Sequence, residues 1–127
     1  MAKYLVDTSI FVDHLRGRVQ ATKLIDDTQG IIISFVVFGE LLQGINDKGE
    51  LKKLEKLMNL YELDWGQGKI MKLAINLLKQ YGLMQGIGLI DAILAATALT
   101  RKLTLITDNI KHFRIIEGLI VKLPGEV

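Results

Sequence analysis

The sequence predicts an α/β fold, a three-layer sandwich in which helices cover both faces of a mostly parallel central sheet. Short aliphatic runs alternate with amphipathic helical runs along the 127 residues. Such alternation implies right-handed crossovers between parallel strands. Half of the residues are hydrophobic but only 6% are aromatic, so aliphatic side chains must do most of the packing. This composition is typical of a sheet buried on both faces.

The order of elements follows from hydrophobic periodicity and from capping residues. Strands are expected at Lys3–Asp7, Ile31–Phe35, Tyr61–Asp64, Leu103–Thr107 and Leu119–Lys122. Helices are expected at Ile10–Arg16, Val19–Thr28, Val36–Ile45, Lys48–Leu60, Gln67–Tyr81 and Leu89–Arg101, with a helical turn at Asn109–Phe113. Ser9 and Ser34 stand where N-caps are needed. Without repeats or linkers, residues 1–127 are predicted to form one domain.

Composition also excludes several classes of function. The chain has no cysteine, which removes disulfides, thiolate metal sites and cysteine nucleophiles and suits a reducing cytoplasm. No apolar run approaches the ~18 residues of a membrane helix, and Asp7 comes too early for a signal peptide. We therefore expect a cytoplasmic protein without a membrane segment. The net charge of +2 permits contact with a polyanion without requiring it.

Acidic residues fall repeatedly at one edge of the predicted sheet. Asp7 ends the first strand, and Asp108 follows the fourth. Glu40 lies in the second turn of the helix after the second strand, and Asp91 lies in the first turn of the helix that leads to the fourth. Ligands of open parallel sheets bind at the carboxyl ends of the strands. These acids are therefore candidates for a common site.

Each acid also has a purely structural interpretation. An aspartate at a strand end commonly forms a turn, and an aspartate in the first turn of a helix stabilises the helix dipole. The surroundings of two acids weigh against this. The helix of Asp91 carries no other charge before Arg101, and Glu40 lies among apolar neighbours. An uncompensated carboxylate in such a position costs several kcal/mol.

Converging carboxylates without cysteine or histidine form a hard, oxygen-rich site that suits Mg²⁺ or Mn²⁺. Because the carboxylates repel one another, the site should be poorly organised or partly protonated before metal enters. Two such ions about 3.5–4 Å apart can activate water and stabilise the leaving oxygen of a phosphodiester.

The ordered set of segments resembles the PIN-domain nucleases, and specifically the VapC-type toxins of toxin–antitoxin pairs. The resemblance extends from Lys3 to about Leu123. The matching stretches are Leu5-Val6-Asp7-Thr8-Ser9, Ile33-Ser34, Glu40-Leu41-Leu42-Gln43-Gly44, Gly88, Asp91-Ala92-Ile93-Leu94-Ala95-Ala96-Thr97-Ala98, Leu105-Ile106-Thr107-Asp108-Asn109 and Lys111-His112-Phe113.

The resemblance implies a PIN-like fold and an endoribonuclease that uses Mg²⁺ or Mn²⁺ to cleave RNA phosphodiesters. Asp7, Glu40 and Asp91 would be the principal metal ligands and catalytic acids. Asp108 is the expected fourth acid, although a strict reading of the Thr-x-Asp/Asn signature that begins at Thr107 gives Asn109 instead. The family further implies an antitoxin partner, whose tail lies across the active-site groove, and a homodimer.

Two hydroxyls beside the first acid are expected to support the site. By resemblance, Ser9 or Thr8 would contribute its side chain there, while Ser9 also caps the first helix. A role for Ser9 as a cap alone remains the alternative.

Three other functions compete with this interpretation. A non-catalytic module could use the same acidic pocket to bind a basic segment of a partner. A PIN nuclease could serve in housekeeping RNA processing. A receiver-like phosphoryl-transfer protein also gathers acids at strand ends, but it would be expected to carry an acid where Ser9 stands.

Overall fold

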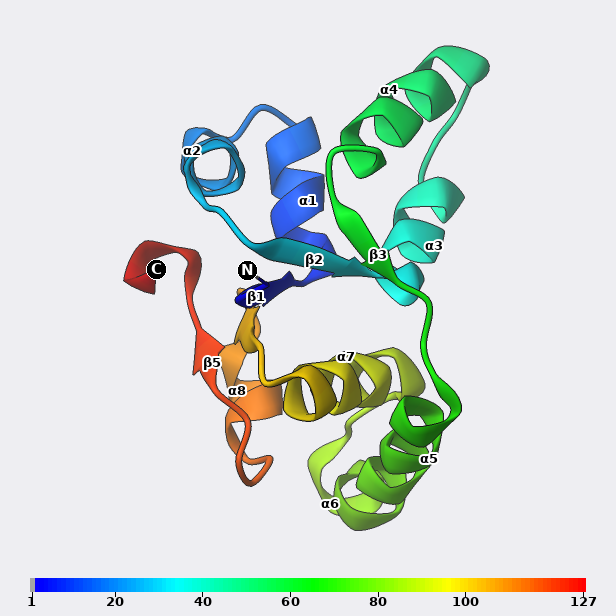
Figure 1. Ribbon diagram of the computed structural model, residues 1–127, viewed down its shortest axis with the longest axis vertical. Coiled ribbons are helices and arrows are strands. Elements are labelled where there is room, and N and C mark those ends of the chain that lie inside the picture. Colours follow the sequence, from blue (N-terminus) through cyan, green and yellow to red (C-terminus); the bar gives the residue numbers. More distant parts are fainter. Residues whose placement is uncertain (1) are drawn as a thin grey trace.

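The computed structural model describes residues 2–127 and places a parallel sheet at the centre of the molecule (Figure 1). The five strands run in the order β3-β2-β1-β4-β5, and every neighbouring pair is parallel. Their bounds are β1 Tyr4–Val6, β2 Ile31–Ser34, β3 Glu62–Asp64, β4 Thr104–Ile106 and β5 Val121–Lys122. The predicted α/β class and parallel sheet are thus confirmed.

Helices cover both faces of the sheet (Figure 1). One face carries α1 (Thr8–Leu15), α2 (Val19–Asp27), α3 (Phe35–Gln43) and α4 (Lys48–Met58). The other face carries α5 (Gly68–Leu77), the π-helical turn η1 (Leu78–Gly82), α6 (Leu83–Gln85), α7 (Leu89–Arg101) and α8 (Ile110–Arg114), and the chain ends in the 3₁₀ turn η2 (Pro124–Glu126). No helix within residues 2–127 is long and apolar enough to cross a bilayer.

The strand order explains this division into layers. The chain first moves outward from β1 to β2 and β3, and then returns past β1 to form β4 and β5. Because crossovers between parallel strands are right-handed, reversing the direction puts the second set of helices on the opposite face. The reversal leaves a crevice at the carboxyl ends of β1 and β4, which is where ligands bind in sheets of this kind.

Helix α7 is the internal helix that its nearly all-apolar sequence predicts. Every residue from Ala92 to Ala98 is buried, and the helix packs against β1, β4 and α5. Its first turn therefore has a fixed position beneath the crevice, with Asp91 at the margin of the buried stretch.

Two expected element boundaries are wrong. Helix α1 begins at Thr8 and is capped by Asp7, not by Ser9, because the Asp7 carboxylate accepts a hydrogen bond from the first backbone N–H of the helix. The helical path after α5 also continues past Gly82, which keeps a helical φ of −63°, to Gly86. Gly86 has a φ of +73°, the left-handed conformation in which glycine commonly ends a helix.

Candidate functional site

A cavity of about 530 Å³ opens at the carboxyl ends of β1 and β4. All four acids predicted from the sequence line it, together with most of the expected supporting residues. The lining consists of Asp7, Thr8, Ser9, Glu40, Gly88, Leu89, Ile90, Asp91, Asp108 and Asn109. Thr107 is fully buried behind this lining and reaches the site through a hydrogen bond to Asp7.

Asp7 is held from two sides at the junction of β1 and α1. Its Oδ1 accepts a hydrogen bond of 2.7 Å from the Thr8 backbone N–H. Its Oδ2 accepts one of 2.7 Å from the Thr107 hydroxyl, which in turn accepts one of 3.0 Å from the Asn109 backbone N–H. The backbone N–H of Asp7 also bonds to the Ile106 carbonyl of the neighbouring strand β4. The orientation of this carboxylate is therefore fixed by both central strands.

Glu40 reaches the cavity from α3. This helix follows β2 without a loop, and its N-cap is Ser34, as predicted, whose hydroxyl accepts a hydrogen bond from the Val36 N–H. The Thr8 hydroxyl donates to Glu40 Oε1. Thr8 therefore contacts two acids at once, through its backbone N–H to Asp7 and its hydroxyl to Glu40.

Asp91 extends into the cavity from the first turn of α7. Its Oδ2 lies 3.4 Å from Nδ1 of His112 on α8. The sequence does not predict a contact between His112 and Asp91, because the two residues are 21 positions apart on different elements. Only the convergence of α7 and α8 on the same crevice brings the two side chains together.

The electrostatics of the cavity act most strongly on Asp7. Burial raises the pKa of the Asp7 carboxyl, and the charges of Asp91 and Glu40 raise this pKa further. The hydrogen bonds from Thr107 and Thr8 oppose the increase without cancelling it. The charges of Asp91 and Glu40 thus make the ionisation of Asp7, in the cavity that all three line, less favourable.

The Ser9 hydroxyl is a further polar group at this site. Its Oγ is buried and has no hydrogen-bond partner within residues 2–127. Ser9 does not cap α1, so the alternative that it serves as a cap alone is wrong. A buried hydroxyl without a partner costs free energy, which makes Ser9 a candidate to contact whatever occupies the cavity.

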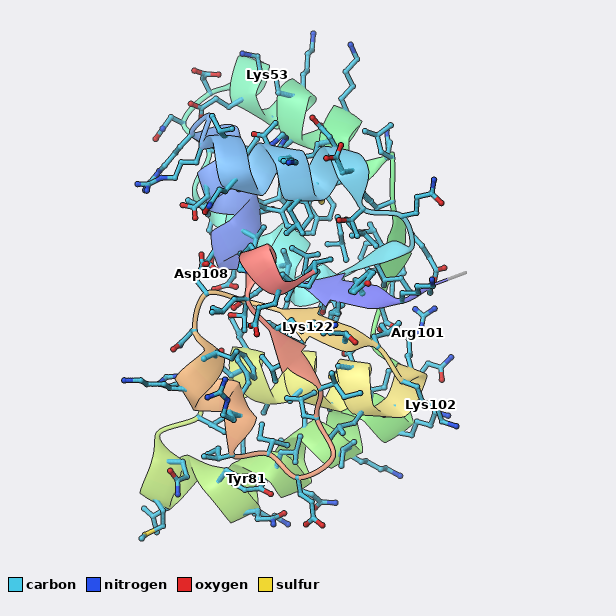
Figure 2. All side chains as sticks on the ribbon, turned by 90° about the vertical axis from the view of Figure 1, so that its left-hand side faces the viewer. Lys53, Tyr81, Arg101, Lys102, Asp108 and Lys122 are labelled. Carbon is cyan, nitrogen blue, oxygen red and sulfur yellow. The ribbon has the colours of Figure 1, made fainter. Side chains whose placement is uncertain are left out.

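Asp108 lies apart from the other three acids. Asp108 lines the cavity, but its side chain is exposed and lies toward the left edge of the molecule in Figure 2. Burial and the nearby carboxyl of Asp13, which shares a hydrogen bond with it, raise the pKa of Asp108, while Arg18 lowers it. The charges that act on Asp7 come from Asp91 and Glu40. Asn109, the rival fourth ligand, also lines the cavity with an exposed side chain.

The donor set fits a hard divalent cation. Asp7, Glu40 and Asp91 offer carboxylate oxygens, and Ser9 adds a hydroxyl without a partner in residues 2–127. Within that same part of the chain, no three acidic or histidine side chains are already arranged as a cation site.

A second cavity, of about 480 Å³, opens on the other side of Glu40, between α1, α3 and α4. Its wall is largely apolar and includes Val12, Leu15, Leu41, Ile45 and Leu54. Charged groups at its margin include Arg16, Glu50 and Lys53. Because Glu40 lines both cavities, this groove leads to the acidic site.

The sequence of the chain matches the model of the PIN domain family over residues 4–118. Ribonuclease VapC19 of Mycobacterium tuberculosis is 34% identical over 114 residues, which cover 86% of this chain and 90% of the relative. Ribonuclease VapC1 of Rickettsia felis is 34% identical over 125 residues, which cover 92% of each.

The fold of the chain is also similar to those of solved toxin–antitoxin structures. The chain resembles a toxin–antitoxin complex from Klebsiella pneumoniae with a TM-score of 0.83 and 27% identity, covering 96% of this chain and 98% of the other. It resembles VapBC2 of Rickettsia felis, bound to a DNA fragment from its promoter, with a TM-score of 0.74 and 29% identity, covering 94% and 97%.

Proposed function

This chain belongs to the PIN-domain family, and we propose that it is a metal-dependent endoribonuclease that acts as the toxin of a toxin–antitoxin pair. The observation that carries the proposal is the convergence of Asp7, Glu40 and Asp91 on one cavity. No lysine or arginine within residues 2–127 forms an ion pair with any of the three. The relatives named ribonucleases support the choice of reaction.

Three carboxylates would hold the cation, Mg²⁺ or Mn²⁺, at the switch point of the sheet. When bound, the cation supplies Lewis-acid activation of water and neutralises charge on the phosphodiester. The residues of this chain do the positioning. Thr107 and the Thr8 backbone fix Asp7, and the Thr8 hydroxyl fixes Glu40. Ser9 is placed to contact the cation or a water molecule in the cavity.

RNA is the proposed substrate. Leu89 and Ile90 form an apolar part of the cavity wall, and 52% and 36% of their respective surfaces are exposed. They precede Asp91 directly on α7, so they would contact a base or a ribose while the phosphate lies near the acids. Arg18 lies close enough to Asp108, which lines the cavity, for its charge to act on that carboxyl, so it would bind a neighbouring phosphate.

An antitoxin is the proposed protein partner. The groove between α1, α3 and α4 is apolar and ends at Glu40, so a segment bound there would reach the acids. Related structures are complexes of a toxin with its antitoxin. A homodimer of this chain is part of the same proposal and follows from the family resemblance alone.

The function is tested by incubating the purified chain with end-labelled single-stranded RNA and Mn²⁺. Asp91→Asn should lower the cleavage rate by about 10²–10⁴-fold, because several kcal/mol of transition-state stabilisation depend on the cation. Asp27→Asn is the matched control, since Asp27 is exposed at the end of α2 and should leave the rate unchanged. Cleavage by Asp91→Asn at the unaltered rate, or no cleavage by the original chain at any Mn²⁺ concentration, would contradict the proposal.

A non-catalytic acidic module is the second candidate. The observation in its favour is that the acids in residues 2–127 are not already arranged as a cation site. A chelator separates the two functions: the module would bind a basic peptide equally well with and without EDTA and would cleave no RNA. Cleavage that requires Mn²⁺ and disappears with EDTA would exclude this candidate.

A further inference from the structure

We propose that His112 is a positioning residue for the cation site and acts by holding the carboxylate of Asp91. The inference rests on the proposed function, because it assigns a role toward the cation that Asp7, Glu40 and Asp91 would bind. The observation behind it is the distance of 3.4 Å between His112 Nδ1 and Asp91 Oδ2. The two side chains are 43% and 27% exposed, respectively, so both stand partly sheltered at the wall of the crevice.

The position of His112 is set by its own short helix. Phe113, the next residue, is fully buried and anchors α8 in the core. The backbone N–H of His112 bonds to the Asn109 carbonyl at 3.3 Å, and the backbone N–H of Asn109 bonds to the Thr107 hydroxyl at 3.0 Å. That hydroxyl donates to Asp7. Hydrogen bonds through Asn109 and Thr107 therefore connect α8, the helix that carries His112, to Asp7.

Asp7, Glu40 and Asp91 each have one side-chain partner in residues 2–127. Thr107 donates to Asp7, Thr8 donates to Glu40, and His112 faces Asp91. Each of these three partners is distant in sequence from the acid it contacts, and none is a lysine or an arginine. His112 is the only side chain within residues 2–127 that contacts the Asp91 carboxylate by a hydrogen bond.

This pattern has a physical consequence for cation binding. The contact with His112 involves one oxygen of Asp91, Oδ2, and leaves Oδ1 with no protein partner in residues 2–127. A carboxylate held through one oxygen presents the other in a defined direction, which lowers the entropy lost when a cation binds. The role requires an N–H at Nδ1, which is present in the protonated ring and in one of the two neutral tautomers.

The structural alternative is that His112 only helps α8 pack against α7. The two roles differ in what a substitution would change. A packing residue affects the melting temperature, whereas a positioning residue affects the affinity for the cation at unchanged fold. Removing an outer-shell partner of a metal ligand typically costs about 10–100-fold in metal affinity.

The test measures Mn²⁺ binding by calorimetry on the full chain for three variants, with melting temperature and RNA kinetics alongside. His112→Ala should weaken Mn²⁺ binding by about 10–100-fold. His112→Asn should restore most of the affinity, because the asparagine amide nitrogen stands at the same distance along the side chain as Nδ1. His112→Gln should not, because its amide extends one bond further. At saturating Mn²⁺, the kcat of His112→Ala for RNA cleavage should approach that of the original chain.

His14 provides the matched control. Its Nδ1 lies 2.9 Å from the Thr22 hydroxyl, in a contact between α1 and α2 outside the cavity. His14→Ala should leave Mn²⁺ affinity unchanged even if it lowers the melting temperature.

The outcomes separate the inference from the proposed function. Unchanged Mn²⁺ affinity in His112→Ala, together with lost affinity in Asp91→Asn, overturns the role of His112 and leaves the proposed function standing. Equal affinities for His112→Asn and His112→Gln also overturn it, and this comparison holds even if His112→Ala fails to fold. No Mn²⁺ binding by the original chain overturns both proposals.

Discussion

Two aspartates of this protein occupy equivalent places in the sheet and have opposite surroundings. Asp7 follows β1 and Asp64 ends β3, and each accepts a backbone N–H from a following residue at its Oδ1. The difference lies at Oδ2. Asp7 receives a hydroxyl from Thr107, whereas Asp64 receives the Arg101 guanidinium at 3.1 Å. Arg101 also binds Glu62 at 2.7 Å.

The comparison separates a structural acid from a functional one. Asp64 is 9% exposed and its charge is compensated by a cation of the protein, so this pair joins the edge strand β3 to the end of α7. Asp7 has two acidic neighbours in place of a cation, and its pKa is raised by burial and by their charges. In the view of Figure 2, Asp108 lies toward the left of the molecule and Arg101 toward the right. Partly buried acids that form no ion pair with a lysine or an arginine in residues 2–127 therefore mark the site.

The largest expected effect tests this contrast directly through activity. Asp7→Asn should lower RNA cleavage with Mn²⁺ by about 10²–10⁴-fold, because a cation ligand is lost. Asp64→Asn removes a charge that is more buried and should leave the rate within about twofold, since its partner is Arg101, outside the cavity. Equal losses of activity in the two variants would show that an ion pair with a protein cation does not distinguish a structural aspartate from a functional one.

The second prediction concerns the stability of the compensated pair. Arg101→Met leaves the Asp64 charge buried and should lower the free energy of unfolding by about 2–3 kcal/mol, somewhat below the value for a fully buried pair, because 28% of the Arg101 side chain is exposed. Urea unfolding measures the loss, and Lys72→Met, an exposed position on α5, is the control. A loss no larger than that of the control would refute the structural role of the pair. Mn²⁺ affinity should not change.

The third prediction is that removing a charge from the cavity stabilises the protein, whereas breaking the Arg101–Asp64 pair destabilises it. Because the pKa of Asp7 is raised in the folded chain, the stability linked to this group is fully present below the ordinary pKa of an aspartate and is lost as the pH rises through the raised pKa. Asp7→Asn should therefore stabilise the metal-free chain at neutral pH and raise its melting temperature.

Melting curves in EDTA between pH 4 and pH 8 measure this effect. The difference between Asp7→Asn and the original chain should grow as the pH rises, and added Mn²⁺ should stabilise only the original chain. A variant that is less stable than the original chain at every pH would contradict the prediction.

The smallest expected effect concerns the fourth acid. Asp108 is exposed, and the acid whose charge acts on it is Asp13 rather than Asp7, Glu40 or Asp91. Asp108→Asn should change Mn²⁺ affinity by less than about threefold, because exposed charges are screened by solvent and salt. Calorimetry of Asp108→Asn beside Asn109→Ala decides between the two rival ligands. A tenfold loss in Asp108→Asn would place this residue among the ligands after all.

The fold class and the positions of the acids at the ends of strands and helices follow from the sequence alone. Alternating strand and helix patterns predicted the parallel sheet, and the bounds of α7, Leu89–Arg101, followed from its apolar run. The same local patterns put Asp7 at the end of a strand and Asp91 in the first turn of a helix without another charge before Arg101. Periodicity and capping are local properties, so they can be read from neighbours in the chain.

The partner of each acid, in contrast, depends on the tertiary structure. Thr107 contacts Asp7 across 100 positions of sequence, Arg101 contacts Asp64 across 37, and His112 contacts Asp91 across 21. The tertiary structure also explains why Asp7 and not Ser9 caps α1. Strand β1 pairs with β4, and this pairing fixes where the chain leaves the sheet and the helix begins. A carboxylate becomes structural or functional through the charge of its spatial neighbours, and those neighbours are set by the order of strands in the sheet.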